Sequence, residues 1–95
     1  MTVYIDNACI PFGRMLMCHM ISDSPEELRE MADRIGVPKK WIQIVGERDE
    51  HMDICLSKKS VALMLGAREV TARELARILI MRDSPETKKI AIYQD

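Results

Sequence analysis

The sequence predicts an α/β fold: a single domain in which a small mixed β-sheet carries about three helices. Several short segments alternate apolar and polar residues with the period of two that is typical of β-strands. Two other segments open with a helix capping box and continue with apolar residues at helical spacing. A chain of 95 residues supports one hydrophobic core and leaves no room for a second. We therefore expect residues 1–95 to form one α/β domain.

Four segments are predicted to be strands because their side chains alternate between two faces: residues 3–6, 15–20, 41–45 and 51–56. A turn is expected between the first two, at Pro11-Phe12-Gly13. His19 then lies near the end of the second strand. In the fourth strand the alternation places His51, Asp53 and Cys55 on one surface, so that a histidine and a carboxylate are presented together.

The first helix is predicted from the capping box Ser24-Pro25-Glu26-Glu27. Proline suits the first helical position, and a glutamate follows the capping serine by three residues. Gly36 supplies the stop, after apolar residues at Leu28, Met31, Ala32 and Ile35. Asp23 precedes the cap, where the positive end of a helix stabilises a carboxylate or binds an anion.

Two further helices are predicted in the C-terminal half of the chain. Ser57 is expected to cap a short helix over residues 58–65. Thr71 and Glu74 form another capping box, which opens a second helix. Residues 89–93 alternate like a final strand.

The composition is that of an ordinary globular protein, with 47% hydrophobic and 31% charged residues. Charge is spread unevenly, since residues 1–56 hold 6 basic and 10 acidic side chains and residues 57–82 hold 6 and 2. The basic stretch either meets an anion or pairs with the acidic half. Three cysteines without C-x-x-C spacing indicate neither a disulfide framework nor a structural zinc site, which favours the cytoplasm. No apolar run approaches the roughly 18 residues of a membrane span, so no membrane contact is expected.

The two histidines give the clearest indication of a functional site, because imidazole titrates near neutral pH and binds metals. Each stands near an aspartate, in His19-x-x-x-Asp23 and in His51-Met52-Asp53. Three explanations stay open: the histidines hydrogen-bond their neighbours at strand ends, bind a ligand, or hold a metal and act in acid–base catalysis. The spacing does not match a strong metal motif such as H-E-x-x-H.

A second candidate is an anion site at Ser57, Lys58 and Lys59, where a hydroxyl, ammonium groups and free backbone N–H groups start a helix. No glycine-rich loop precedes it, and a solvated helix start explains the same residues. Gln43 is expected beside the histidines.

The two C-terminal helices also resemble a helix-turn-helix in outline. Four arginines could contact phosphates there: Arg68, Arg73, Arg77 and Arg82. The second helix lacks the asparagine and glutamine side chains that read base edges. Nucleic acid is therefore the less favoured partner, and a helical hairpin packed on the sheet is preferred.

A resemblance is carried by five segments: Tyr4-Ile5-Asp6, Gly13-Arg14-Met15-x-Met17-Cys18-His19-Met20-Ile21-x-Asp23, Glu27-Leu28-x-x-Met31-Ala32-Asp33-Arg34-Ile35-Gly36-Val37, Trp41-x-Gln43 and His51-x-Asp53-Ile54-x-Leu56-Ser57-Lys58. Their order and spacing are similar to those of short uncharacterised proteins from bacteria and phages, classed as a domain of unknown function, over about residues 1–75. The resemblance implies no activity. It does imply that the polar signature residues form a shared binding site: His19, Asp23, Glu27, Gln43, His51, Asp53 and Lys58.

The chain departs from this family pattern at three positions. Met52 replaces the usual tyrosine of His-Tyr-Asp, Ile42 replaces an aromatic residue, and Arg29 replaces a histidine. The missing histidine speaks against a dedicated metal site.

The leading hypothesis is a non-enzymatic bacterial or phage accessory protein that binds a small anionic, nucleotide-like ligand without a cofactor. Phosphate would bind at Ser57, Lys58 and Lys59, and the rest of the ligand would be hydrogen-bonded by His19, Asp23, Gln43, His51 and Asp53. Analogy with small phage proteins suggests an anti-defence or regulatory role. A homodimer in the cytoplasm is expected, because symmetry readily completes a small pocket.

Two alternatives stay open. A metal-dependent phosphoesterase or nuclease would use His19, His51 and Asp53 as ligands of a divalent metal, with Asp23 or Glu27 as the base. A protein- or DNA-interaction factor would use the basic C-terminal helices.

Overall fold

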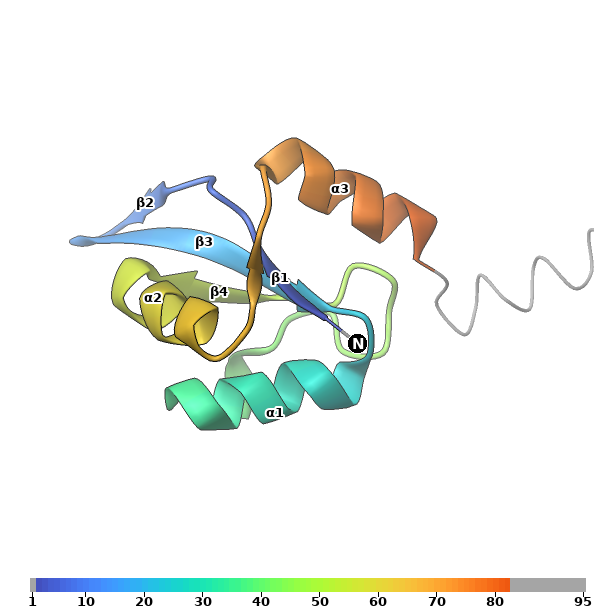
Figure 1. The fold of residues 1–95 in the computed structure, drawn as a ribbon, viewed down its shortest axis with the longest axis horizontal. Coiled ribbons are helices and arrows are strands. Elements are labelled where there is room, and N and C mark those ends of the chain that lie inside the picture. Colours follow the sequence, from blue (N-terminus) through green and yellow to red (C-terminus); the bar gives the residue numbers. More distant parts are fainter. Residues whose placement is uncertain (1, 83–95) are drawn as a thin grey trace, which may run out of the picture.

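The computed structural model describes residues 2–82, which form a five-stranded mixed sheet and three α-helices (Figure 1). The strands are β1 (Val3–Ile5), β2 (Ile10–Phe12), β3 (Met15–Ser22), β4 (Met52–Cys55) and β5 (Arg68–Glu69). The helices are α1 (Pro25–Ile35), α2 (Leu56–Met64) and α3 (Ala72–Met81), with a short 3-10 helix, η1 (Lys39–Trp41), after α1. The predicted α/β class with a small mixed sheet is confirmed.

The long strand β3 is the centre of the sheet. Met20 pairs with Ile5 of β1 on one side and with Met52 of β4 on the other, both antiparallel. Nearer its start, β3 pairs with β2, so β1 and β2 run along the same edge of β3. The edge of β1 away from β3 is occupied by β5, which runs parallel to β1.

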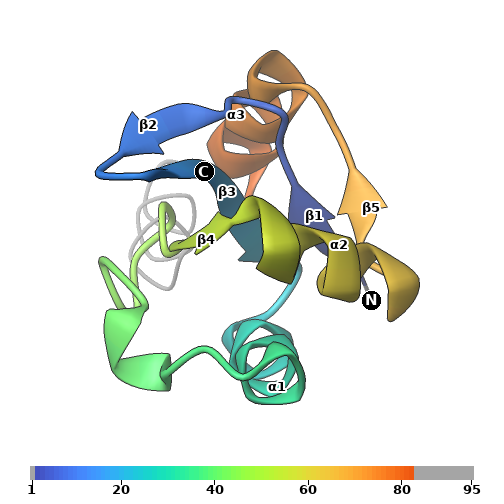
Figure 2. The ribbon, with the colours of Figure 1, turned by 90° about the vertical axis from the view of Figure 1, so that its left-hand side faces the viewer.

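The helices cover the two faces of the sheet unequally (Figures 1 and 2). On one face α1 and α2 enclose the larger core, in which Cys18 and Met20 pack with Leu28 and Ala62. On the other face α3 makes a smaller cluster, where Ile21 packs with Val70 and Leu75. Because α3 covers only the Ile21 end of β3, the rest of this face stays open for a site.

The caps of α1 and α3 form as predicted. Ser24 Oγ accepts the backbone N–H of Glu27 at 3.3 Å, and Gly36 ends α1 at a φ of 76°, a left-handed conformation that glycine adopts without strain. Thr71 Oγ1 accepts the backbone N–H of Glu74 at 3.0 Å. Both signals are local, so the sequence is sufficient to place these helices.

In the described part of the chain, no helix is long and apolar enough to span a membrane.

The strand predicted over residues 41–45 is wrong. Trp41 ends the 3-10 helix η1, and only Gln43 makes a β-bridge, to His51. Ile44 has a φ of 55°, which turns the chain away from an extended path directly after that bridge. The alternation of apolar and polar residues therefore marks a loop that touches the sheet at one residue.

Other boundaries differ from the prediction as well. The turn expected at Pro11-Phe12-Gly13 lies one to two residues later, and Ile10–Phe12 is the edge strand β2, where proline is tolerated. The short strand β5 was not predicted. The helix α2 begins at Leu56 with Cys55 as its N-cap, so Ser57 lies inside its first turn. The strand predicted over residues 89–93 lies outside the described residues.

Candidate functional site

The site is built around a buried carboxylate, Asp6, at the end of β1. Asp6 is 1% exposed, and its Oδ2 lies 2.7 Å from His19 Nδ1. Its Oδ1 accepts the backbone N–H of His19 at 2.8 Å, while its own N–H donates to the His19 carbonyl at 3.0 Å. The chain bulges between β1 and β2, and the N–H of Ala8 in this bulge also donates to Oδ1, at 3.3 Å. The imidazole of His19 is thereby held in one orientation.

The imidazole of His51, which lies directly before β4, is also held by a hydrogen bond. Its Nδ1 lies 2.8 Å from the carbonyl oxygen of Asp49. The bridge between His51 and Gln43 is closed by two backbone hydrogen bonds, of 2.8 and 3.2 Å. The rings of His19 and His51 meet edge to face, with their centroids 5.7 Å apart.

Asp53 lies between these two imidazoles because it is the register partner of His19 across β3 and β4. Its Oδ1 is 3.8 Å from Nε2 of His19 and 3.8 Å from Nε2 of His51, and it has no hydrogen-bond partner. Its Oδ2 accepts the side-chain N–H of Gln43 at 3.1 Å. The structure thus brings together four of the predicted site residues: His19, Gln43, His51 and Asp53.

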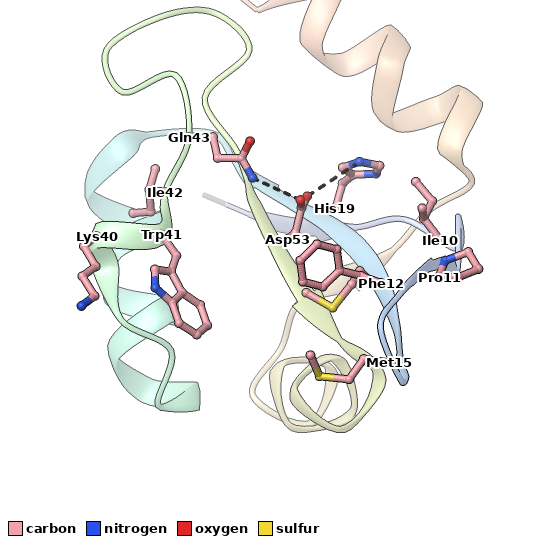
Figure 3. A pocket seen from close by; sticks show the side chains of 11 residues that line it. Ile10, Pro11, Phe12, Met15, His19, Lys40, Trp41, Ile42, Gln43 and Asp53 are labelled. Atoms are coloured by element: carbon pink, nitrogen blue, oxygen red, sulfur yellow. Dashed lines mark hydrogen bonds and ion pairs between the residues drawn. The ribbon is translucent and has the colours of Figure 1, made fainter.

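Asp53 and His19 line one end of a cavity of about 620 Å³ (Figure 3). Trp41 stands on one side of this cavity, with Phe12 and Met15 on the other. The remaining lining residues are Ile10, Pro11, Met17, Lys40, Ile42 and Gln43. The cavity therefore combines an apolar, aromatic body with a compact polar end.

Five of the predicted site residues do not line this cavity: Asp23, His51, Ser57, Lys58 and Lys59. Lys59 is buried: its Nζ donates to the backbone carbonyl of Asp6 at 2.9 Å and pairs with Glu69 at 2.7 Å. Burial is the largest single influence on the pKa of Lys59 and would lower it, but the hydrogen bond and charge of Glu69, together with nearby Cys18 and Cys9, outweigh burial and raise the pKa above the ordinary value. Ser57 Oγ lies 3.2 Å from the Sγ of Cys55, and Lys58 Nζ lies near Gly36.

Within the predicted phosphate site, the contacts of Lys59 are internal to the protein. Lys59 holds the bulge that positions Asp6, so its ammonium group is engaged inside the protein. Lys40 is the lysine that lines the cavity, and it follows α1 rather than starting α2.

Asp23 is also separate from the histidines. Its Oδ2 accepts the backbone N–H of Thr2 at 2.7 Å, and it lines a different cavity, beside Arg77 and Arg82. His19 is paired with Asp6 and not with Asp23, so proximity in the sequence pointed to the wrong carboxylate.

Arg82 is one of the four arginines that could contact phosphate in the less favoured nucleic-acid alternative, and in the structure it bonds within the fold. Its guanidinium donates to the carbonyls of Ser22 at 2.6 Å and Glu50 at 3.1 Å, and also to the carbonyl of Arg48. Burial lowers its pKa from the ordinary value. This arginine ties the end of α3 to the loop before β4.

Several residues of the site were not predicted from the sequence. The contact of Asp6 with His19 depends on the pairing of β1 with β3. Trp41 was not among the predicted site residues, yet it is 56% exposed and lines the cavity. An aromatic side chain after Lys39 and Lys40 could have indicated a surface position.

Within residues 2–82, no group of three or more histidine, cysteine, aspartate or glutamate side chains is arranged to hold a metal ion. The two Nε2 atoms and Asp53 Oδ1 are near one another but do not form such a group as they stand.

The fold and the cavity define a small α/β protein with a ligand-sized hollow on the open face of its sheet. The chain belongs to the family described as "Protein of unknown function (DUF4031)", whose model matches residues 3–82. Neither the curated proteins nor the solved structures gave a match.

Proposed function

We propose that the protein is a non-enzymatic binding module for a small nucleotide-like ligand, which occupies the cavity beside Trp41. The observation that carries the proposal is the composition of this cavity, in which aromatic and apolar walls lead to hydrogen-bonding groups at one end. Its volume of about 620 Å³ is in the range of small-molecule sites. His19, Asp53 and Gln43 supply that polar end.

The apolar walls suit a planar ring. Trp41 is 56% exposed and Phe12 is 69% exposed, although burying aromatic rings is usually favourable. Stacking a nucleobase on an aromatic side chain contributes about 1–3 kcal/mol. A planar ligand in this cavity would therefore bury aromatic surface of Trp41 and Phe12 that is exposed without it.

The anionic part of the ligand is assigned to Lys40. This lysine lines the cavity, whereas Lys59 is bonded to Asp6 and Glu69. Lys40 lies on the far side of Trp41 from Asp53 (Figure 3), so a phosphate bound by Lys40 would be apart from that carboxylate, which limits repulsion between like charges.

The biological setting is a further part of the proposal. The resemblance to bacterial and phage proteins supports an accessory protein that sequesters its ligand in a regulatory or anti-defence role. The three cysteines are free, which supports the cytoplasm. Exposed apolar residues on α2 and α3, such as Met64 and Met81, support a homodimer, which sedimentation analysis would test.

The chain offers a direct test, because Trp41 is its one tryptophan. We expect a nucleoside or nucleotide from a broad panel to quench the fluorescence of Trp41 and to raise the melting temperature. Asp53→Ala should abolish both effects with the fold intact by circular dichroism. Asp33→Ala is the matched control, since Asp33 is an exposed residue of α1 that pairs with Lys39. A panel in which no compound changes either signal would overturn the proposal.

A metal-dependent phosphoesterase or nuclease is the second candidate, favoured by the convergence of His19, His51 and Asp53. A divalent ion would have to draw these side chains closer, since the distances from Asp53 Oδ1 are 3.8 Å. Titration of untagged protein with Zn²⁺ or Mn²⁺ decides this, because a metal enzyme must bind the ion and lose it in His51→Ala.

A protein- or DNA-interaction factor is the third class. It predicts binding that weakens steeply with salt and survives His51→Ala.

A further inference from the structure

The hydrogen bonds made by Nδ1 of His19 and of His51 determine whether Nε2 of each ring donates or accepts. A carboxylate or carbonyl oxygen can only accept, so Nδ1 of His19 and Nδ1 of His51 each donate, to Asp6 and to Asp49. In a neutral imidazole with hydrogen on Nδ1, Nε2 is an acceptor. Both Nε2 atoms lie 3.8 Å from Asp53 Oδ1, too far for a hydrogen bond.

Gln43 also lines this end of the cavity. Its amide nitrogen donates to Asp53 Oδ2, so its amide oxygen points away from the carboxylate (Figure 3). Among residues 2–82, no lysine or arginine forms an ion pair with Asp53. The polar end of the cavity is thus rich in acceptors and poor in donors.

We infer that the ligand presents an N–H-bearing edge to Asp53 and His19, as an amino-substituted heteroaromatic ring does. This inference rests on the proposed function and names the chemistry of its ligand. The side chain of Asp53 is 39% exposed although its Oδ1 is buried, so the oxygen that a donor in the cavity can reach is Oδ2. Oδ2 accepts one hydrogen bond, from Gln43, and a carboxylate oxygen has a second lone pair for another donor.

A carbonyl in place of the amino group would bring two acceptors together. A site built around hydrogen bonds rejects an analogue that leaves buried polar groups unpaired. We therefore expect the amino-bearing member of a matched pair to bind at least about 10-fold more tightly.

The experiment uses three pairs of nucleosides: adenosine with purine riboside, guanosine with inosine, and cytidine with uridine. The first two pairs differ by an amino group alone, and the third exchanges an amino group for a carbonyl. Dissociation constants are measured from Trp41 fluorescence on the unchanged protein, then on Asp53→Asn and on the control Asp33→Asn. We expect the amino-bearing member to be preferred in at least one pair, and Asp53→Asn alone to erase the preference.

The outcomes separate this inference from the proposed function. Equal binding within every pair, or a preference for the members that lack the amino group, overturns the inference and leaves a nucleoside-binding cavity in place. Binding of no nucleoside or nucleotide at all overturns the proposed function, and the inference with it.

Discussion

The carboxylate of Asp6 and the imidazole of His19 form a closed pair, in which both oxygens of one residue bond two different N–H groups of the other. The backbone N–H of Asp6 returns a bond to the His19 carbonyl. Three hydrogen bonds between two residues that are thirteen positions apart fix the imidazole before any ligand arrives. The first predictions concern this pair.

Replacing the buried carboxylate should destabilise the protein and release His19. In Asp6→Asn the amide cannot accept from both the backbone N–H and Nδ1 of His19, so one buried group loses its partner. We expect the free energy of unfolding to fall by about 1–3 kcal/mol, measured by urea denaturation. Asp33→Asn is the matched control, since Asp33 and Lys39 form an exposed pair of the kind that contributes about 0–1 kcal/mol. Equal effects in the two variants would contradict the role given to Asp6.

The hydrogen positions on both imidazoles can be observed directly. We expect ¹⁵N NMR of the unliganded protein to show His19 and His51 with hydrogen on Nδ1, because their partners there are acceptors only. His19 should lose this preference in Asp6→Asn, whereas His51 should keep it, since a backbone carbonyl holds that ring. If NMR instead showed hydrogen on Nε2 of either neutral ring, that Nε2 could not accept a hydrogen bond from the ligand, which would contradict the inferred ligand chemistry.

The extent to which the sequence predicts this fold depends on how local each signal is. The caps at Ser24 and Thr71 need only three neighbouring residues, so α1 and α3 could be predicted. The contact between Asp6 and His19 depends on the register of two paired strands, which a single sequence does not disclose.

The site, like the fold, combines features that local sequence signals predict with features that depend on tertiary structure. His51 and Asp53 could be placed on one surface by alternation within β4, and His19 joins them because it is the cross-strand partner of Asp53. The cavity itself could not be predicted, because it depends on a loop that leaves Trp41 exposed. The alternation over residues 41–45 suggested a strand, since apolar spacing does not distinguish a strand from a loop that borders a hollow.

Lys59 and Lys40 should separate stability from binding. In Lys59→Met the carbonyl of Asp6 loses its donor, and we expect the free energy of unfolding to fall by about 1–3 kcal/mol. Lys40→Met should leave stability unchanged and weaken the binding of a nucleotide more than that of its nucleoside. Urea denaturation and Trp41 fluorescence measure the two effects. If Lys59→Met lost nucleotide affinity and Lys40→Met did not, the result would favour the phosphate site that the sequence predicts at the start of α2.

The contribution of Lys59 should also depend on pH. Its pKa in the folded protein is raised above the ordinary value of 10.5, so its stabilising effect is fully present below that value. The effect is lost as the pH rises through the higher, folded pKa. The difference in unfolding free energy between the unchanged protein and Lys59→Met should therefore be constant from neutral pH to about pH 10 and shrink above it. A difference that grew with rising pH would contradict this sign.

Cys55 should react faster than Cys18, because their environments move the two thiol pKa values in opposite directions. The hydrogen bond from Ser57 and the N–H of Lys58 lower the pKa of Cys55, whereas burial raises the pKa of Cys18. More thiolate at a given pH means faster alkylation. We expect iodoacetamide at pH 8 to label Cys55 well before Cys18, as followed by peptide mass mapping. Ser57→Ala should slow the labelling of Cys55 and leave Cys18 unchanged. If Ser57→Ala has no effect on Cys55, the side chain of Ser57 does not stabilise the thiolate, and its contact with Sγ has another role.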